Sequence, residues 1–246
     1  MVPADEAPAD NDSLRVEVSA GVGWLIFNRP ASGNAINAAM FQALPQVWRR
    51  LDADPDVRAI VVTGSGKHFH TGLDMGALAR QPDSLRRATR QTREARLEIT
   101  GWHLGVRTPV VAAVNGTCAG GGLHFVVDAD VVIASSNARF IDPHVSVGQA
   151  SAWEAVGLTR RIPATVASRL ALIGRHEYLS ADRARQVGLV SEVVDPAELH
   201  ARAQWIAECI AAQDPRMAAA IKAAMWAGQE IGRSAAMRAA AAALHD

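Results

Sequence analysis

Apolar and polar residues alternate along the first part of the chain in the manner of β-strands. The alternation runs over residues 14–18, stops at Ala20 and Gly21, and resumes over residues 22–27, which predicts a β-hairpin. Later runs rich in β-branched residues are typical of strands buried in a parallel sheet. They cover residues 57–63, 110–114 and 131–134, with a shorter strand predicted at 189–194.

Helical spacing of apolar residues separates these strands and dominates the C-terminal third. Residues 37–53 have such spacing, with Asn37 as N-cap and Pro45 expected to kink or divide the helix. Further helices are predicted over residues 85–104, 123–128, 165–173, 180–186, 196–213 and 215–243. Alternating strands and helices predict an α/β fold with right-handed crossovers, followed by a helical region that is not a second independent domain.

Composition places the chain among globular proteins that act on small molecules. Of its 246 residues 49% are hydrophobic, and 25 basic side chains balance 25 acidic ones, so no overall charge favours nucleic acid or an anionic membrane. Cys118 and Cys209 form neither a disulfide framework nor a zinc-type cluster, so we expect a cytoplasmic protein without a metal ion. Residues 1–13 are expected to be a disordered tail, and no apolar run is long enough to span a bilayer.

A glycine-rich turn follows one of the predicted buried strands. Gly120, Gly121 and Gly122 come after the strand at 110–114 and precede a helix that contains His124. Consecutive glycines permit close backbone approach and leave N–H groups free near a helix N-terminus, where they can bind an anion or polarise a carbonyl oxygen. A tight strand–helix connection without a ligand has the same pattern, so the turn alone does not establish a site.

A second glycine-bearing loop follows the strand at 57–63. If Gly72 turns this loop inward, the N–H of Leu73 becomes a second donor facing the glycine turn, and two such donors form an oxyanion hole. His68 and His70 fit either ligand contacts or ordinary surface positions. Asp74 fits either chemistry or the capping of a following helix.

Five motifs occur in an order that resembles the enoyl-CoA hydratase/isomerase (crotonase) superfamily. They are FNRP-x4-AIN at 27–37, HFHTGLD at 68–74, VAAVNGTCAGGG at 111–122, the Asp128 and Asp130 pair, and LSADRARQVGLVSEVV at 179–194. The resemblance covers residues 14–230 and implies a ClpP-like spiral of ββα units over residues 14–195. It also implies a helical region at 196–246 that supports a homotrimer or a dimer of trimers.

The resemblance implies a chemistry as well. Members of the superfamily bind acyl-CoA thioesters and hold an enolate between two backbone N–H groups, and the matching positions are Leu73 and Gly121. Coenzyme A would then enter as part of the substrate and not as a bound cofactor. Candidate contacts with substrate or coenzyme A are Arg29, His68, His70, Gly72, Asp74, Gly120, Trp153 and Lys222, although the loop after Pro30 lacks the family's usual basic residue.

The acid/base positions depart from the family pattern. Hydratases of the superfamily carry two glutamates where this chain has His124 and His144. Water addition to a double bond needs one group to activate water and another to protonate carbon, and two imidazoles are able to divide these roles. Glu154 lies close to the register of a catalytic carboxylate in some relatives. We expect it to orient or charge one histidine, with Asp142 as another candidate.

Three functions stay open at this point. The first is an acyl-CoA enzyme that uses histidines for isomerisation, hydration or hydrolysis and differs from a standard hydratase. The second is a CoA-independent hydrolase of cyclic β-diketones, and the third is a catalytically silent acyl-CoA-binding protein. A Rossmann dinucleotide site is disfavoured because its glycine motif follows the first strand of a βαβ unit, whereas the glycine triplet here lies in the middle of the chain.

Overall fold

The computed structural model describes residues 12–80 and 97–243, so the tail predicted at 1–13 lies mainly outside the described residues. Its main sheet has six strands, and every neighbouring pair except β1 with β2 is parallel. In sheet order the strands are β1 (Leu14–Ser19), β2 (Val22–Phe27), β3 (Ala59–Gly64), β5 (Val110–Val114), β7 (Val131–Ser135) and β10 (Glu192–Val194). Ala20 and Gly21 form the hairpin turn with φ of 51° and 78°. The predicted α/β class and hairpin are confirmed.

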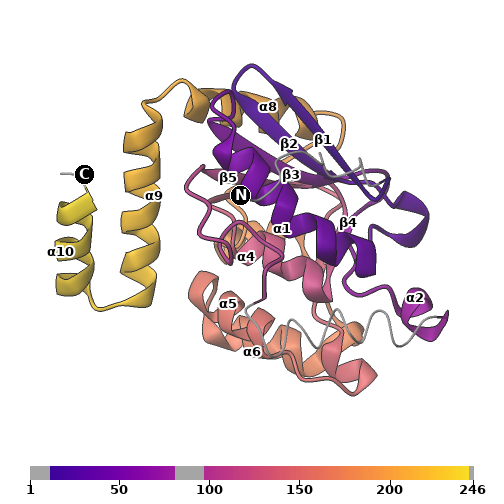
Figure 1. Ribbon diagram of the computed structural model, residues 1–246. Coiled ribbons are helices and arrows are strands. Elements are labelled where there is room, and N and C mark those ends of the chain that lie inside the picture. The colour runs from indigo at the N-terminus through magenta and orange to yellow at the C-terminus, as the bar shows by residue number, and fades with distance from the viewer. Residues whose placement is uncertain (1–11, 81–96, 244–246) are drawn as a thin grey trace, which may run out of the picture.

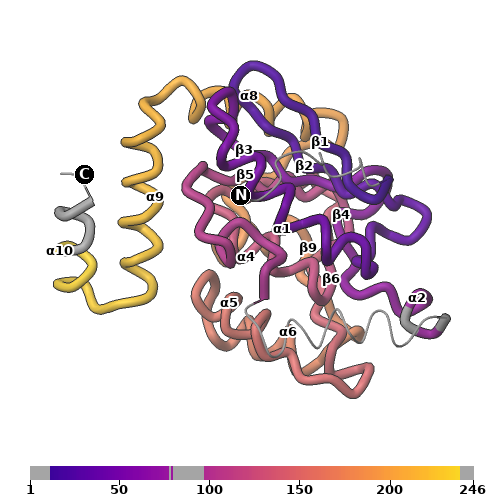
Figure 2. The backbone as a smooth tube through the Cα atoms, in the orientation of Figure 1, coloured from indigo at the N-terminus to yellow at the C-terminus, as the bar shows by residue number. Residues whose placement is uncertain are grey.

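A second, smaller sheet shows how the chain winds. β4 (His68–His70), β6 (Thr117–Ala119) and β8 (Arg139–Ile141) pair in parallel, and β9 (Leu179–Ser180) joins β8 antiparallel. Each of β4, β6 and β8 directly follows a strand of the main sheet, so the chain passes from one sheet to the other at every turn (Figure 2). This is the spiral of ββα units that the family resemblance implies. The strands of the small sheet are too short for an alternation pattern to reveal them.

The first long helix begins where the sequence places its cap. The Asn37 side chain accepts a hydrogen bond from the Met40 N–H at 2.9 Å, and α1 (Ala38–Ala53) starts at the next residue. Pro45 lies inside α1 without dividing it. The buried face of α1, which includes Trp48, packs against the main apolar cluster of the protein.

Two helix predictions need correction. Residues 97–104, predicted as the end of a helix that starts at 85, form irregular turns, and residues 81–96 lie outside the described residues. The Trp48 indole donates a hydrogen bond to the Ile99 carbonyl at 2.9 Å, which ties these turns to α1. The helix predicted over 215–243 is two helices, α9 (Pro215–Glu230) and α10 (Arg233–Ala243), because Ile231 is extended. The two helices stand side by side at one end of the molecule (Figure 1).

The two faces of the main sheet are covered differently. On one face α8 (Leu199–Ala211) packs closely through the small side chains of Ala203, Ala207 and Ala211. A larger apolar cluster covers the other face and extends under the small sheet. The remaining α-helices of the described residues are α2 (Met75–Arg80), α4 (His124–Val127), α5 (Trp153–Arg161), α6 (Ala164–Ile173) and α7 (Ala181–Gln186). Of these, α5 was not predicted, and α2 was foreseen only as a helix for Asp74 to cap. Among the described helices, none combines the length and apolarity needed to cross a bilayer.

Candidate active site

The end of β4 leads into a turn that directs one backbone donor. Gly72 has a φ of +87°, a conformation that a side chain would strain. Its carbonyl accepts a hydrogen bond from the Ile36 N–H at 2.8 Å, and the Asp74 N–H donates to the Ile36 carbonyl at 3.0 Å. Because the N–H of a trans peptide points opposite to its C=O, the Leu73 N–H points away from Ile36.

The glycine triplet forms the facing turn. Gly120 has a φ of +52° and begins a 3-10 helix, η2 (Gly120–Leu123), which runs directly into α4. A side-chain carbon on Gly72 would lie 3.3 Å from the backbone nitrogen of Gly121, so the two turns are in close contact. The backbone N–H groups of Leu73 and Gly121, named from the sequence as paired donors, therefore belong to adjacent turns.

His124 and Glu154 reach the same space from neighbouring helices. His124 opens α4 directly after the glycine turn, and Glu154 lies in the first turn of α5. Nε2 of His124 lies 3.2 Å from Oε1 of Glu154, and the two side chains are only 6% and 7% exposed. A carboxylate buried to this extent needs a polar partner, and the imidazole provides one.

His144 completes the cluster. Its Nε2 lies 3.6 Å from Oε1 of Glu154, and its Nδ1 lies 2.7 Å from Oδ1 of the fully buried Asp142. A side-chain carbon on Gly120 would lie 3.6 Å from Cε1 of His144, so the imidazole faces the glycine turn. The structure thus brings together His124, His144 and Glu154 beside the two backbone donors.

The groups of this cluster shift the pKa values of Glu154 and His144 in opposite directions. Burial by itself raises the pKa of Glu154, but the hydrogen bond and charge of His124 and the charge of His144 outweigh burial and lower that pKa. The pKa of His144 is raised, first by the hydrogen bond to Asp142, which acts against burial, and then by the charges of Glu154 and Asp142. Glu154 is therefore a carboxylate at neutral pH, and His144 keeps its proton to a higher pH than a free histidine does.

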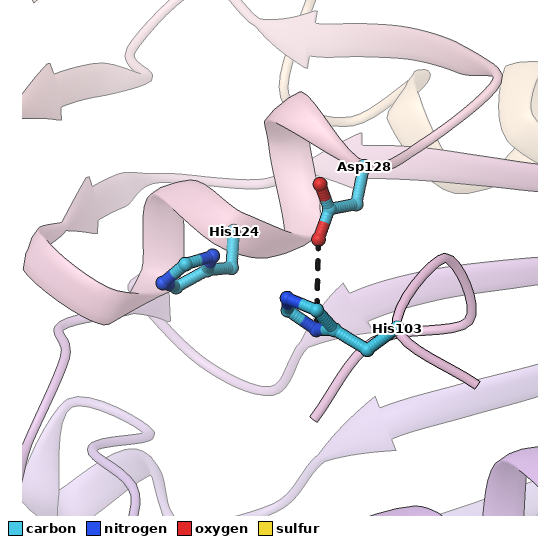
Figure 3. Close-up of side chains that lie close together, drawn as sticks. All are labelled: His103, His124 and Asp128. Atoms are coloured by element: carbon cyan, nitrogen blue, oxygen red, sulfur yellow. Dashed lines mark ion pairs between the residues drawn. The ribbon is translucent and has the colours of Figure 1, made fainter. Parts of the chain in front are cut away.

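A second polar group, formed by His103 and Asp128, lies beside His124. His103 and Asp128 point toward it (Figure 3), and the ring centroids of His103 and His124 are 5.5 Å apart. Ligand-type atoms of these three residues lie within 4.8 Å of one another, close enough to share an ion. The Thr100 hydroxyl donates to Oδ2 of Asp128 at 2.7 Å and lies 2.7 Å from Nδ1 of His103. Hydrogen bonding through Thr100 accounts for the arrangement of His103 and Asp128.

Thr100 and His103 were not singled out from the sequence. Both lie in the segment 97–104, which was predicted to be helical, and no strand end or glycine turn marks them. The sequence signal that could have pointed to them is the spacing of His124 and Asp128, four residues apart. This spacing places both side chains on one face of a helix, where they need a polar partner from another segment.

Two predicted coenzyme A contacts are held in ion pairs within the chain. Arg29 pairs with Asp74 at 2.8 Å. Lys222 pairs with Asp130 at 3.1 Å and donates to the Thr108 carbonyl at 2.9 Å. These two basic side chains are therefore already engaged by groups of the protein.

The other predicted contact residues differ in exposure. Trp153 is 55% exposed at the start of α5, whereas His70 is 1% exposed and His68 is half-buried. Asp74 accepts a hydrogen bond from the Ala77 N–H at 2.7 Å, so it does cap the start of α2. The buried position of His70 differs from the surface position that its loop also permitted.

A spiral of ββα units with a glycine turn after a buried strand is the architecture of the crotonase class of enzymes. Comparison with known protein families gives the same class. The chain belongs to the enoyl-CoA hydratase/isomerase family, whose model matches residues 17–246.

Known proteins similar to this chain support the assignment. The chain is 35% identical over 220 residues to (E)-benzylidenesuccinyl-CoA hydratase of Thauera aromatica, covering 89% of this chain and 84% of the relative. It is 31% identical over 232 residues to peroxisomal Delta(3,5)-Delta(2,4)-dienoyl-CoA isomerase of Arabidopsis thaliana, covering 89% and 82%. An enoyl-CoA hydratase/isomerase structure from Mycobacterium paratuberculosis matches with a TM-score of 0.86 and 33% identity, over 96% of this chain and 89% of that one. The predicted family, spiral fold and enzyme class are confirmed.

Proposed function

We propose that this protein binds an acyl-CoA thioester and stabilises its enolate between the backbone N–H groups of Leu73 and Gly121. The observation that carries the proposal is the position of Oε1 of Glu154, 3.2 Å from His124 and 3.6 Å from His144, beside the turn that presents these donors. The names of the hydratase and the isomerase reported above both contain a CoA-linked substrate, which supports this substrate class.

The charges of the cluster indicate how protons move. Glu154 removes a proton from the carbon next to the thioester carbonyl, the C–H electron pair forms a C=C bond, and the carbonyl π pair moves onto oxygen. Each backbone donor then stabilises the developing oxyanion by about 3 kcal/mol. His144 donates a proton to a carbon of the enolate, and transfer of the first proton from Glu154 to His144 restores the cluster. His124 orients Glu154 through their 3.2 Å contact.

The histidines separate this chemistry from standard hydration. A pair of glutamates can exchange proton roles during water addition, whereas here a carboxylate with a lowered pKa faces a histidine with a raised one. A fixed acceptor and a fixed donor suit removal of a proton from one carbon and its return to another. We therefore favour isomerisation over hydration for this site.

Deuterium exchange tests the enolate step without assuming the complete reaction. A saturated acyl-CoA is incubated with the protein in D2O, and incorporation at the α-carbon is followed by mass spectrometry. The parent is expected to catalyse exchange, and Glu154→Gln to slow it by about 10²- to 10⁴-fold because the base is lost. Glu177→Gln is the matched control, since Glu177 pairs with Arg169 at the surface at 2.7 Å and is expected to exchange at the parent rate.

The alternatives predict different results. Calorimetric binding of acyl-CoA without any exchange would contradict catalysis and favour the silent acyl-CoA-binding protein. Equal exchange rates in the parent and Glu154→Gln would show that another group is the base.

A CoA-independent hydrolase of cyclic β-diketones is a second candidate, and one observation favours it. Arg29 and Lys222, the basic side chains expected to contact coenzyme A, are both engaged in ion pairs within the chain. In this reaction Glu154 takes a proton from water, the resulting hydroxide adds to one carbonyl carbon, and the bond to the carbon between the two carbonyls breaks. That carbon leaves as an enolate and takes a proton from His144. Calorimetric titration with free CoA separates the candidates, because only the acyl-CoA enzyme is expected to bind it.

We also propose a homotrimer or a dimer of trimers, as the family resemblance implies. Large apolar side chains are exposed on α8 and α9, among them Trp205, Met217, Ile221 and Met225, and such surfaces are typical of subunit contacts. Sedimentation velocity of the full chain tests this proposal, which a monomer would contradict.

The cytoplasmic location and the division of the chain between residues 195 and 196 stay predictions.

A further inference from the structure

His70 lies where the two donor turns meet. It is the last residue of β4 and pairs with Cys118 of β6, the strand that leads into the glycine triplet. A side-chain carbon on Gly122 would lie 2.3 Å from the His70 carbonyl oxygen and 3.2 Å from its Cβ, so the triplet packs directly against this residue. His70 therefore contacts the glycine turn as well as ending the strand that enters the Gly72 turn.

The imidazole of His70 also accepts a hydrogen bond from the turn. The Gly72 N–H donates to Nδ1 of His70 at 3.1 Å, so Nδ1 carries no proton. Burial, followed by the charges of His124 and Arg29, lowers the pKa of His70 to about 3, and the ring is neutral at neutral pH. A neutral ring with an unprotonated Nδ1 carries its one proton on Nε2.

The other ring nitrogen, Nε2, makes histidine less favourable here than an apolar side chain that only fills space. Phe27 and Phe125 pack against the ring, with centroids 4.8 Å and 5.1 Å away. Within residues 12–80 and 97–243, Nε2 is buried and has no hydrogen-bond partner. A buried N–H without a partner costs about 1–3 kcal/mol, which an apolar side chain in this position would avoid. The hydrogen bond that Nδ1 accepts from Gly72 is a contact that an apolar side chain in this position could not make.

We infer that His70 is a positioning residue that holds Gly72 so that the Leu73 N–H faces the bound carbonyl. The inference rests on the proposed function, because it takes the Leu73 N–H as an oxyanion donor. Ile36 fixes the peptide that carries this N–H, through the Gly72 carbonyl at 2.8 Å, and His70 fixes the preceding peptide at 3.1 Å. With both peptides held, the otherwise permissive dihedrals of Gly72 are fixed before substrate binds.

Asparagine and glutamine at position 70 separate positioning from packing. Oδ1 of asparagine takes the place of Nδ1 and can accept from the N–H two residues along the chain, as in an Asx-turn, whereas the glutamine amide reaches the place of Nε2. In the deuterium-exchange assay we expect His70→Ala and His70→Gln to lower kcat about 10- to 100-fold with little change in KM, and His70→Asn to stay within about threefold of the parent. His176→Asn, at an exposed histidine of η4 (Gly174–His176), is the control.

Amide hydrogen exchange at Gly72, measured by NMR, gives a second readout that needs no substrate. We expect protection of this amide in the parent and in His70→Asn, and its loss in His70→Gln. Equal protection in all three, or equal kcat in all of the position-70 variants of an active parent, would overturn the inference. If Gly72 protection follows the expected order but the parent exchanges no acyl-CoA protons, the hold on the turn is supported and the proposed function fails.

Discussion

Two histidine–aspartate pairs lie at the acid/base cluster, and the pKa values of their histidines are shifted in opposite directions. In one pair Nδ1 of His144 lies 2.7 Å from Asp142, and the pKa of His144 is raised by that hydrogen bond. In the other pair Nδ1 of His103 lies 3.8 Å from Asp128. Burial lowers the pKa of His103 to about 3 and raises that of Asp128 to about 6. The pKa of the first histidine is thus raised, whereas the second histidine is neutral at neutral pH.

Side-chain burial alone does not explain this difference between the histidines. His144 is 17% exposed and His103 is 11% exposed, so both lose most of their contact with water. The direct hydrogen bond to Asp142 stabilises the imidazolium form of His144 and outweighs burial. For His103 the Thr100 hydroxyl is the nearer partner, and it contributes a hydrogen bond without a charge. The pKa of a histidine beside an aspartate is thus raised where the two side chains share a hydrogen bond, and lowered where burial and the charge of His124 dominate.

The largest expected effect, a loss of activity, follows from breaking the hydrogen-bonded pair of His144 and Asp142. Asp142→Asn removes the carboxylate that raises the pKa of His144, so we expect kcat for α-proton exchange near neutral pH to fall about 100-fold. Activity that needs protonated His144 is lost as pH rises through its pKa, so the alkaline limb of the pH–rate profile should move to lower pH. Asp195→Asn, at an exposed turn, is the matched control. An unmoved alkaline limb would show that Asp142 does not set the charge of His144.

Breaking the pair of His103 and Asp128, which Thr100 links, is expected to lower the stability of the fold and to leave the reaction rate unchanged. Thr100→Val preserves the shape of the side chain but leaves Oδ2 of Asp128 and Nδ1 of His103 without the hydroxyl that bonds them. We expect the free energy of unfolding in urea to fall by about 2 kcal/mol, while the pH–rate profile keeps its shape. Thr159→Val, at an exposed threonine, is the control. A displaced pH–rate profile would mean that this network sets the acid/base chemistry, and the contrast between the pairs would fail.

A smaller effect is expected in the pH dependence of stability. The pKa of His103 is about 3 in the fold and 6.5 ordinarily, so the unfolded chain binds the proton first and stability falls as pH drops from 6.5 toward 3. The pKa of Asp128 is about 6 in the fold and 3.8 ordinarily, so ionisation destabilises the fold and stability falls as pH rises from 3.8 to 6. The two slopes oppose each other within that window.

Asp128→Asn removes one of the two slopes and leaves the other. The unfolding free energy of the variant minus that of the parent should therefore rise with pH between 3.8 and 6, by about 1 kcal/mol per pH unit. Urea denaturation of both proteins across this window measures the difference, in which other titrating groups cancel. A difference that is independent of pH would contradict the raised pKa of Asp128.

The parts of the site that could be predicted depend on local signals. A glycine triplet after a buried strand indicates an unusual turn, and the same holds for Gly72, so Leu73 and Gly121 could be named as donors before any contact was known. Glu154 could be named only as a candidate, because its meeting with His124 depends on how α5 packs against α4. Thr100 could not be found, since its role requires the irregular turns that replace the predicted helix.

The sequence by itself determined the hairpin, the buried strands of the main sheet, the Asn37 cap and membership of the family, because these depend on periodicity, turn chemistry and the order of motifs. Only the tertiary structure decided the small sheet, whose strands are too short to show a pattern, and the surroundings of the histidines. His70 accepts a backbone hydrogen bond in a buried place, while the pKa of His144 is raised and that of His103 is lowered. Their protonation depends on burial and on partners distant in the chain, and packing alone brings those together.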